Sequence, residues 1–357
     1  MSKIGPENPL GILAFDHLEF TCDNFETTES RPLFYKFGFA ITEKSSTDPS
    51  FLFSQGQIRF LLTSPSEGHA REYFKNHGEG VSKLSFLVED AEHAINEAKK
   101  RGAEVVQELQ VQESEHGLFK TAQIKGFGDV LNEFVERPRT QFRPGYTKVE
   151  EDPQHTPLKQ RVARIDHITN NVPKGEMKKW VKFYEDIYGF KVTRYFDIKG
   201  SKTGLQSEVV QLADGAIIIP INEPDAENGK SQIQEFLDRH NGSGVQHIAL
   251  TTANIADTVG SLQEQGIRFL DIPHTYYEAI PNRGMNVTED LELLEKRQLL
   301  VDGDAEGYLL QNFTDTYIGP LFFEIIQRKN HNGFGEGNFQ ALFDAIELDQ
   351  VQRGYLK

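Results

Sequence analysis

The sequence predicts an α+β protein made of two tandem open β-barrel domains, with one more helix at the C-terminus. Three observations predict this fold. The two halves of the 357-residue chain resemble each other, short strand-like runs alternate with helical patterns in each half, and a segment without clear periodicity separates the halves. The repeating pattern is strand–helix–strand–strand–strand (βαβββ), used about twice per half. Such units can close into an open barrel whose concave side holds a small ligand.

The internal repeat aligns four separate places in the two halves. The spacing agrees as well as the residues: 22 positions separate Gly80 from Gly102, and 22 separate Gly244 from Gly266. Because the period is about half the chain, the repeat predicts a pair of domains and not a solenoid. The aligned segments are 15–18 with 165–168, 38–39 with 189–190, 78–87 with 242–250, and 128–137 with 319–328.

Periodicity and turn residues locate the elements. Residues 51–63 are typical of a hairpin around Gly56, and residues 206–221 of a second hairpin with its turn at 213–215. Helical patterns cover residues 91–101, 177–188, 231–241, 255–265 and about 339–353, the last after the glycine-rich segment 333–338. Residues 138–161 are rich in proline, glutamine and charge. We therefore predict an N-terminal domain over 1–140, a linker over 141–161 and a C-terminal domain over 162–357.

Composition narrows the class of protein. The net charge of −16 disfavours nucleic acid and anionic membrane surfaces as partners. No apolar run approaches the ~20 residues that cross a bilayer, and the first residues lack the apolar core of a signal peptide. Cys22 is the only cysteine, so an intrachain disulfide is excluded. Together these features predict a cytoplasmic protein.

Three residues of the C-terminal half form a candidate metal site. His167, His247 and Glu324 each lie inside a β-branched or aromatic run and are expected on strands, at positions that the repeat makes equivalent. Two imidazoles and one carboxylate leave about three coordination positions open, which suits non-haem Fe(II). Zinc would accept the same ligands. Ordinary hydrogen-bonded strand residues are the structural alternative for each of the three. His240 and His274 lie outside apolar strand runs and are expected on the surface or in loops.

The N-terminal half differs at one decisive position. It keeps His17 and Glu133, but Lys83 stands where the other half has His247. A protonated lysine cannot bind a metal. We therefore predict that the N-terminal domain is a degenerate barrel without metal, in which Lys83 pairs with Glu133.

The C-terminal half closely resembles the 4-hydroxyphenylpyruvate dioxygenases, a family of the vicinal-oxygen-chelate superfamily. The N-terminal half resembles them more loosely. The matching segments cover most of residues 160–357: 166–172, 194–200, 203–207, 219–223, 231–236, 244–248, 322–328 and 333–343. The resemblance implies a glyoxalase/extradiol dioxygenase-like fold of βαβββ modules with one Fe(II) per chain, held by His167, His247 and Glu324.

The resemblance also implies a set of pocket residues. Phe313 and Phe339 would sandwich an aromatic ring, Ser207 and Asn222 would bond a phenol or a neighbouring water, and three glutamine amides would orient the substrate. Core packing, turn chemistry and solvated polarity are the structural alternatives. The final helix would be a lid that excludes water, or else an ordinary cap on the barrel. The pocket residues implied are Ser207, Pro220, Asn222, Gln232, Gln246, Gln311, Phe313, Phe334 and Phe339.

The family's reaction converts 4-hydroxyphenylpyruvate and O₂ to homogentisate and CO₂ in tyrosine catabolism. The substrate carries its own α-keto acid, so 2-oxoglutarate is not needed. The nearest alternative is 4-hydroxymandelate synthase, which hydroxylates the benzylic carbon of the same substrate. The resemblance places Pro220, Asn222 and Phe339 with the homogentisate-forming enzymes. A non-catalytic barrel that binds a small molecule is the alternative from another class. The family is usually dimeric or tetrameric, which implies a homo-oligomer, and the N-terminal domain is a plausible place for its contacts.

Overall fold

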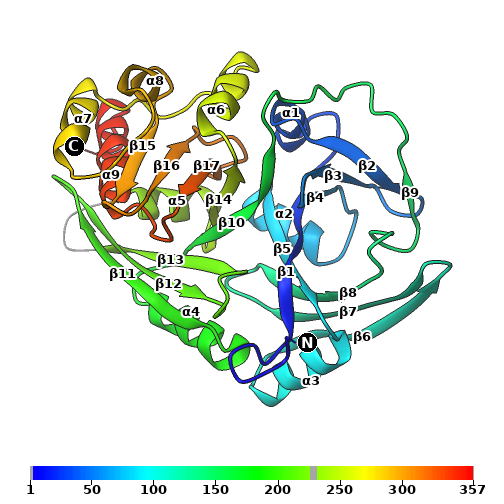
Figure 1. The fold of residues 1–357 in the computed structure, drawn as a ribbon. Helices are drawn as coiled ribbons and strands as arrows, with labels where there is room; N and C mark the ends of the chain where they lie inside the picture. The colour runs from blue at the N-terminus through cyan, green and yellow to red at the C-terminus, as the bar shows by residue number, and fades with distance from the viewer. Residues whose placement is uncertain (1–2, 226–230, 357) are drawn as a thin grey trace.

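The computed structural model describes residues 3–225 and 231–356, and it confirms the predicted α+β fold. Two curled sheets lie side by side, one from each half of the chain (Figure 1). The N-terminal sheet has the strand order β6-β7-β8-β5-β1-β4-β3-β2-β9. Its strands are β1 (Ile12–Thr21), β2 (Ala40–Ser45), β3 (Ser50–Gln55), β4 (Ile58–Thr63), β5 (Gly80–Val88), β6 (Val105–Ser114), β7 (Gly117–Lys125), β8 (Leu131–Glu136) and β9 (Tyr146–Lys148).

The C-terminal sheet repeats this plan in the order β11-β12-β13-β10-β14-β17-β16-β15. In both sheets the first strand of the half pairs antiparallel with the central strand that follows, β1 with β5 and β10 with β14. Three strands that pair antiparallel with one another flank this central pair on each side, and β9 adds a fourth strand beyond β2 in the N-terminal sheet. The strands are β10 (Val162–Asn171), β11 (Lys191–Lys199), β12 (Gly204–Gln211), β13 (Ile218–Asp225), β14 (Gly244–Thr252), β15 (Leu300–Gly303), β16 (Tyr308–Phe313) and β17 (Phe322–Lys329).

The helices complete four βαβββ modules, two per half, as predicted. In the N-terminal half these are α1 (Ser30–Lys36), α2 (His69–His77) and α3 (Ala91–Lys100). In the C-terminal half they are α4 (Met177–Phe183), the π-helical turn η1 (Tyr184–Tyr188), α5 (Gln232–His240), α6 (Ile255–Glu264), α7 (His274–Ala279), the 3₁₀ turn η2 (Ile280–Asn282), α8 (Leu291–Lys296) and α9 (Glu336–Gln352).

Local sequence explains where these helices begin. Ser231 and Asn254 precede α5 and α6, and each side chain accepts a hydrogen bond from the backbone three residues on. The predicted helix at 177–188 is correct in extent, although its last turn is a π-helix. The last helix begins three residues before the predicted start, because Glu336 and Gly337 already belong to α9.

One hydrophobic core crosses the boundary between the halves. Phe37 of the N-terminal half packs against Phe323 of β17 with ring centroids 4.9 Å apart, and Phe86 packs against Tyr188 at 5.5 Å. The predicted hairpin at Gly56 also touches the other half. Gly56 has φ +59°, and a Cβ there would lie 2.6 Å from the carbonyl oxygen of Ala163. Glycine therefore permits both the tight turn and the close approach to β10.

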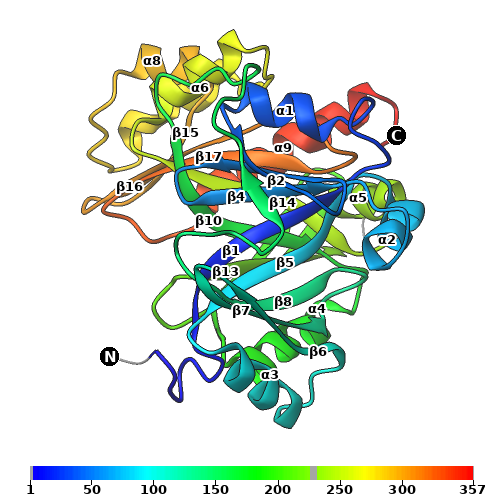
Figure 2. The same cartoon turned by 90° about the vertical axis from the view of Figure 1, so that its right-hand side faces the viewer.

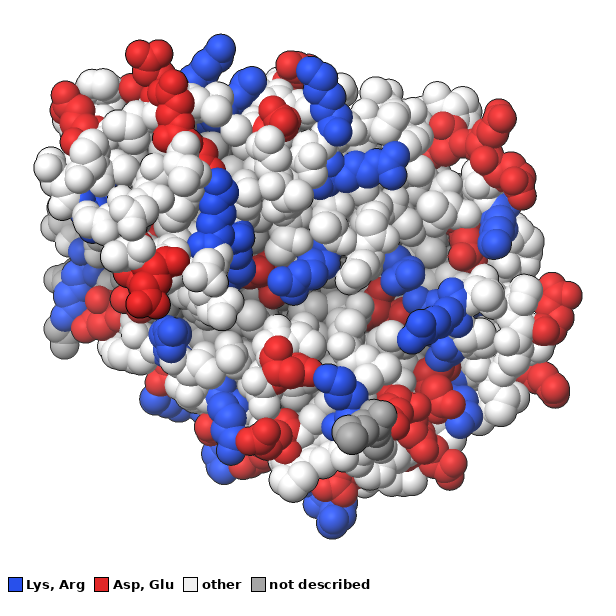
Figure 3. Space-filling model, in the orientation of Figure 1, with Lys and Arg blue, Asp and Glu red and all other residues white. Residues whose placement is uncertain are grey.

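The segment predicted as a linker, 141–161, is not irregular throughout. It contains β9, which pairs with β2 at the edge of the N-terminal sheet, and Phe142, which packs in a small cluster with Leu52 and Leu61. Within residues 3–225 and 231–356, no helix is long and apolar enough to cross a membrane. Acidic and basic side chains are mixed over the face shown in Figure 3.

One expectation about histidines is wrong. His240 is 3% exposed and lies at the end of α5, where the Tyr73 hydroxyl is 2.9 Å from its Nε2 atom. It also stacks against His77, so it belongs to the boundary between the halves and not to the surface. The two views together show α2, which carries Tyr73 and His77, on that boundary (Figure 2). The side chain of His274 is 65% exposed, as expected.

Candidate metal centre and cavity

The three candidate ligands lie on neighbouring strands in the middle of the C-terminal sheet. Residue Ala249 of β14 is opposite His167 of β10 on one side and Glu324 of β17 on the other. His247 lies two residues before Ala249, so its side chain leaves the same face of the sheet. The strand positions predicted for all three residues are therefore confirmed, and sheet register explains why they meet.

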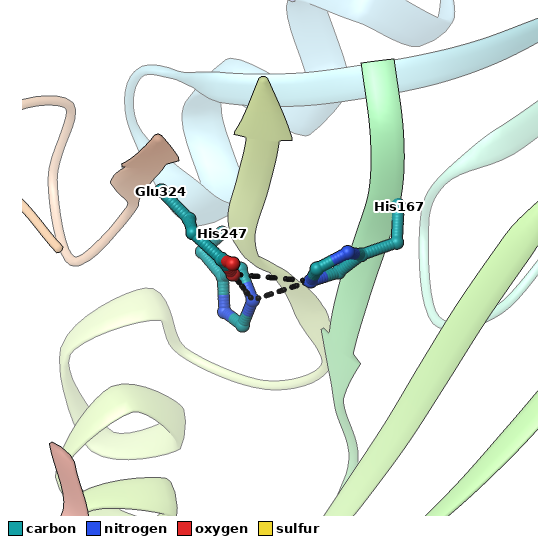
Figure 4. Close-up of side chains that lie close together, drawn as sticks. All are labelled: His167, His247 and Glu324. Atoms are coloured by element: carbon teal, nitrogen blue, oxygen red, sulfur yellow. Dashed lines mark hydrogen bonds and ion pairs between the residues drawn. The ribbon is translucent and has the colours of Figure 1, made fainter. Parts of the chain in front are cut away.

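The donor atoms converge on one point (Figure 4). The Nε2 atom of His167 is 3.1 Å from Oε2 of Glu324, and Nε2 of His247 is 3.4 Å from the same oxygen. The two Nε2 atoms are 3.3 Å apart. Ligand atoms at about 2.0–2.2 Å from a common ion, and at right angles to one another, lie about 3 Å apart. The observed triangle thus fits one face of an octahedral metal site.

Protonation of the metal-free site follows from the same geometry. Burial alone would lower the pKa of His167, but the carboxylates of Glu324 and Asp166 outweigh it and raise the pKa to about 9. Burial lowers the pKa of His247 below its usual value, despite the Glu324 carboxylate. Burial would raise the pKa of Glu324, but the two histidines hold it at about 2. At neutral pH the metal-free His167 therefore carries a second ring proton, which a metal ion would displace.

Hydrogen bonds behind the ligands fix their orientation. The Nδ1 atom of His167 is 3.0 Å from Oδ2 of Asp166, whose two oxygens accept from the Arg328 guanidinium at 3.0 and 2.7 Å. The Nδ1 atom of His247 is 2.9 Å from Oε1 of Gln246. Each acceptor takes the Nδ1 proton and leaves Nε2 for a metal, which is the usual support of histidine ligands.

A cavity opens in front of the candidate ligands. Its lining includes seven of the nine pocket residues expected from the sequence: Ser207, Pro220, Asn222, Gln311, Phe313, Phe334 and Phe339. It also includes residues that the sequence reasoning missed: Thr169, Phe196, Val209 and Leu342. Thr169 and Val209 lie two positions after His167 and Ser207 on their strands, so strand periodicity could have found them. Phe196 is opposite Ser207 in the sheet, and no signal in the sequence shows that register.

The other two expected residues, Gln232 and Gln246, are not among the residues that line the cavity. Gln232 begins α5 and is 8% exposed, and Gln246 points its carbonyl oxygen at His247. Gln246 therefore orients the candidate metal ligand His247. Its amide oxygen also lies 3.5 Å from Nδ2 of Asn222. Gln311 lines the cavity, but its amide donates to Oε1 of Glu324 at 2.9 Å. Both glutamines contact candidate metal ligands directly, which the sequence reasoning did not foresee.

Polar atoms without partners remain in and beside this cavity. Among residues 3–225 and 231–356, the buried hydroxyl of Ser207 and Oδ1 of Asn222 have no hydrogen-bond partner, and neither does Nε2 of Gln232. Ser207 and Asn222 are opposite each other on β12 and β13. Buried polar atoms are rarely left unpaired, because each costs about 1–3 kcal/mol. These atoms therefore mark a place for a polar group of a bound small molecule.

The corresponding site of the N-terminal half is filled with charged side chains. Lys83 donates to Oε2 of Glu19 at 2.8 Å, whereas its distance to Glu133 is 4.0 Å. The expected Lys83–Glu133 pair is thus the weaker of two. Arg143 also reaches Glu133, at 3.1 Å, and together with Lys83 it holds the pKa of Glu133 well below its usual range against the effect of burial. Two cations therefore stand beside the carboxylate that corresponds to Glu324.

An open barrel of βαβββ modules, with a buried His–His–Glu cluster in one half whose donor atoms lie close enough to hold a metal ion, defines the class: a protein of the glyoxalase and dioxygenase superfamily. Comparison with known proteins agrees. Residues 6–143 match the family model of the hydroxyphenylpyruvate dioxygenase N-terminal domain, and residues 164–279 match that of the glyoxalase/bleomycin resistance protein/dioxygenase superfamily. The chain belongs to the 4-hydroxyphenylpyruvate dioxygenase family, as its relatives show.

The relatives match over the whole length of the chain. The 4-hydroxyphenylpyruvate dioxygenase of Pseudomonas aeruginosa is 40% identical, over 100% of this chain and 99% of its own. That of Legionella pneumophila strain Corby is 40% identical, over 98% of both chains. A solved structure of a mutant 4-hydroxymandelate synthase from Streptomyces coelicolor is 24% identical and superposes with a TM-score of 0.83, over 95% of this chain and 99% of the other. The last match shows a shared fold.

Proposed function

We propose that this chain is an Fe(II)-dependent dioxygenase that converts 4-hydroxyphenylpyruvate and O₂ to homogentisate and CO₂. The observation that carries the proposal is the cavity that joins the His167, His247 and Glu324 centre to the unpartnered polar atoms of Ser207 and Asn222. Such a cavity offers both a place for a metal ion and hydrogen-bonding groups for a substrate. A substrate with an α-keto acid and a phenol matches both ends.

The protein's own groups bind and orient the substrate in this scheme. Fe(II), held by the two histidines and the glutamate, supplies the activation of O₂ and chelation of the α-keto acid. Phe313 of β16 and Phe339 of α9 both line the cavity and hold the aromatic ring between them. Ser207 and Asn222 bond the phenol. Such positioning raises the local concentration of the reacting groups.

The C-terminal helix keeps water away from the reaction. Phe339 and Leu342 of α9 line the cavity, and the backbone at 201–203 is tied to this helix by Glu347. Five hydrogen bonds from Ser201, Lys202 and Thr203 end on the Glu347 carboxylate. A helix fastened in this way covers the cavity, and this supports the role of a lid that excludes water.

Product analysis tests the proposal. The metal-free protein is loaded with Fe(II) under anaerobic conditions, mixed with 4-hydroxyphenylpyruvate and then exposed to O₂. We expect homogentisate and CO₂ in equal amounts, and none when Zn²⁺ replaces Fe(II). Formation of 4-hydroxymandelate would assign the chain to the synthase, whose fold it shares, in place of the dioxygenase. Binding of the substrate without any turnover would support the non-catalytic barrel.

We propose further that the enzyme is a cytoplasmic homo-oligomer of two or four chains. The single cysteine supports a reducing compartment. The hairpin β6–β7 extends from the N-terminal half (Figure 1) and exposes Val106, Val111 and Leu118, which supports contact with a second copy there. Light scattering of the wild type and of Val111→Lys tests this: we expect a dimer or tetramer that the substitution weakens. A monomeric wild type would contradict it.

A further inference from the structure

The two oxygens of the Glu324 carboxylate have different partners. Oε2 faces the Nε2 atoms of both histidines, at 3.1 and 3.4 Å. Oε1 accepts a hydrogen bond from the side-chain amide of Gln311 at 2.9 Å. Gln311 therefore decides which carboxylate oxygen turns toward the metal position, provided that its own amide is held with the nitrogen toward Glu324. If the amide were reversed, two acceptor oxygens would face each other.

Asn338 holds the Gln311 amide in that orientation. Its Nδ2 atom donates to Oε1 of Gln311 at 2.9 Å, so the oxygen end of Gln311 is committed to α9 and the nitrogen end to Glu324. Asn338 is fully buried, at 0% exposure. Its own orientation is fixed by Tyr276, whose hydroxyl lies 2.8 Å from Oδ1 of Asn338. The backbone N–H of Val301 donates to that hydroxyl oxygen at 2.8 Å, and the one hydroxyl proton is shared between Oδ1 of Asn338 and the carbonyl oxygen of Val301, which is 2.9 Å away.

The backbone before α9 is shaped around the same glutamine. Gly335 has φ +70°, and a Cβ at this position would lie 2.2 Å from Oε1 of Gln311. The carbonyl oxygen of Phe334 accepts a second, longer hydrogen bond from the Gln311 amide at 3.3 Å. Only glycine allows this close approach. The glycine-rich segment thus serves contact with Gln311, beyond providing a turn before the helix.

We propose that Asn338 is a positioning residue through which helix α9 completes the metal centre. The chain of hydrogen bonds runs from Tyr276 to Asn338, to Gln311 and to Glu324, and every donor in it points toward the carboxylate. The centre has its full set of orienting bonds only when α9 lies over the cavity. This inference rests on the proposed function in one respect, namely that Glu324 binds a metal ion.

Metal titration of two Asn338 variants tests the inference. Metal-free wild type, Asn338→Asp and Asn338→Leu are each titrated with Co(II), and the dissociation constant and the visible absorption of the bound ion are recorded. Both substitutions keep the approximate size of the side chain and remove the donor to Gln311. Loss of a partner that orients a metal ligand costs about 10–100-fold in affinity. Asn338 acts through Gln311, which is the direct partner of Glu324, so we expect a loss near the lower end of that range, about tenfold, and a changed absorption spectrum.

Asn338→Asp separates orientation from charge. An added carboxylate near the centre would by itself attract the cation, so weaker binding of this variant points to the lost donor. Gln340→Glu is the matched control, because Gln340 makes the same amide contacts with groups on the exposed side of α9. It introduces the same chemical change on the same helix, and we expect wild-type affinity.

The outcomes distinguish the inference from the proposed function. If the wild type binds no Co(II), the result contradicts the proposed function. A wild type that binds Co(II), together with Asn338 variants that match it in affinity and spectrum, would overturn the inference alone. If thermal melting shows that both Asn338 variants are unfolded, Tyr276→Phe becomes the test, since it removes one hydroxyl and keeps the ring. Several-fold weaker binding supports the inference, and unchanged binding overturns it.

Discussion

The two halves of the molecule keep the same support around two different centres. In the C-terminal half Asp166 bridges His167 and Arg328, and in the N-terminal half Asp16 bridges His17 and Arg137 in the same way. The agreement continues in the segments that follow β17 and β8. A phenylalanine ring meets the histidine edge-on in each half, Phe334 at 5.6 Å and Phe142 at 5.0 Å.

The two halves differ in the side chains around these retained residues. Glu19 is opposite Lys83 in the N-terminal sheet, where Thr169 is opposite His247 in the C-terminal sheet. An ion pair therefore occupies the place of a metal ligand and its hydroxyl neighbour. The Asp–His–Arg support is therefore compatible with a charged structural cluster as well as with a metal centre. The residue of the central strand that pairs with the first strand, Lys83 or His247, decides whether a half contains a charged cluster or a metal centre.

Removal of one histidine from each half is expected to give the largest contrast. His247→Ala removes a metal donor, and we expect loss of turnover greater than the ~10–100-fold that loss of an orienting partner costs. His17→Ala leaves the C-terminal centre intact, so turnover and one metal per chain should remain. Turnover and metal content are measured on the same purified samples. Full turnover of His247→Ala would contradict the assignment of the ligands.

The ion pair of the N-terminal half is expected to control stability. Lys83→Met leaves Glu19 and Glu133 buried without their ammonium partner, and breaking such a pair costs about 3–5 kcal/mol. Denaturant unfolding, monitored by circular dichroism, measures the change. Lys99→Met is the matched control, because the Lys99–Glu108 pair is exposed and is worth about 0.2–1 kcal/mol. Equal effects of the two substitutions would show that the buried cluster has no special role.

The equivalence of strand positions in the two halves explains why the candidate ligands could be predicted from the sequence while their surroundings could not. The internal repeat selects His167, His247 and Glu324 because strand positions are conserved between the halves. The pairing of Glu19 with Lys83 could not be predicted, since the register between β1 and β5, like that between β10 and β14, includes bulges that the sequence does not show. The contacts of Gln246 and Gln311 depend on which end of an amide faces which neighbour. Sequence spacing carries no information about that choice, and the same holds for the buried position of His240.

The two supporting arginines allow a matched test of the Asp–His–Arg arrangement. Arg328→Met leaves Asp166 without its bidentate partner, and we expect Co(II) affinity to fall about 10–100-fold. Arg137→Met makes the same change beside His17 and should lower only the free energy of unfolding. Metal titration and denaturant unfolding of both variants give the comparison. Unchanged metal affinity in Arg328→Met would show that Asp166 needs no partner to orient His167.

The pH dependence of metal binding is expected to be the smallest of these effects. It amounts to a change of about tenfold in Co(II) affinity per pH unit. The pKa of His167 in the metal-free protein is raised to about 9, so its proton stabilises that form at low pH and this contribution is lost as the pH rises through 9. A metal must displace the proton, and below pH 9 the logarithm of the Co(II) association constant should rise by about one per unit.

Asp166→Asn shows whether that proton belongs to His167. The Asp166 carboxylate helps to raise the His167 pKa, so its neutral analogue should lower the pKa and make the affinity level off at a lower pH. In the N-terminal half, Lys83 and Arg143 balance Glu133, where the C-terminal half balances Glu324 with the His167 proton. If the slope is one and Asp166→Asn leaves unchanged the pH at which the affinity levels off, the displaced proton belongs to another group. A zero slope would mean that His167 is already neutral in the metal-free protein, and the contrast between permanent and displaceable charge in the two halves would then be lost.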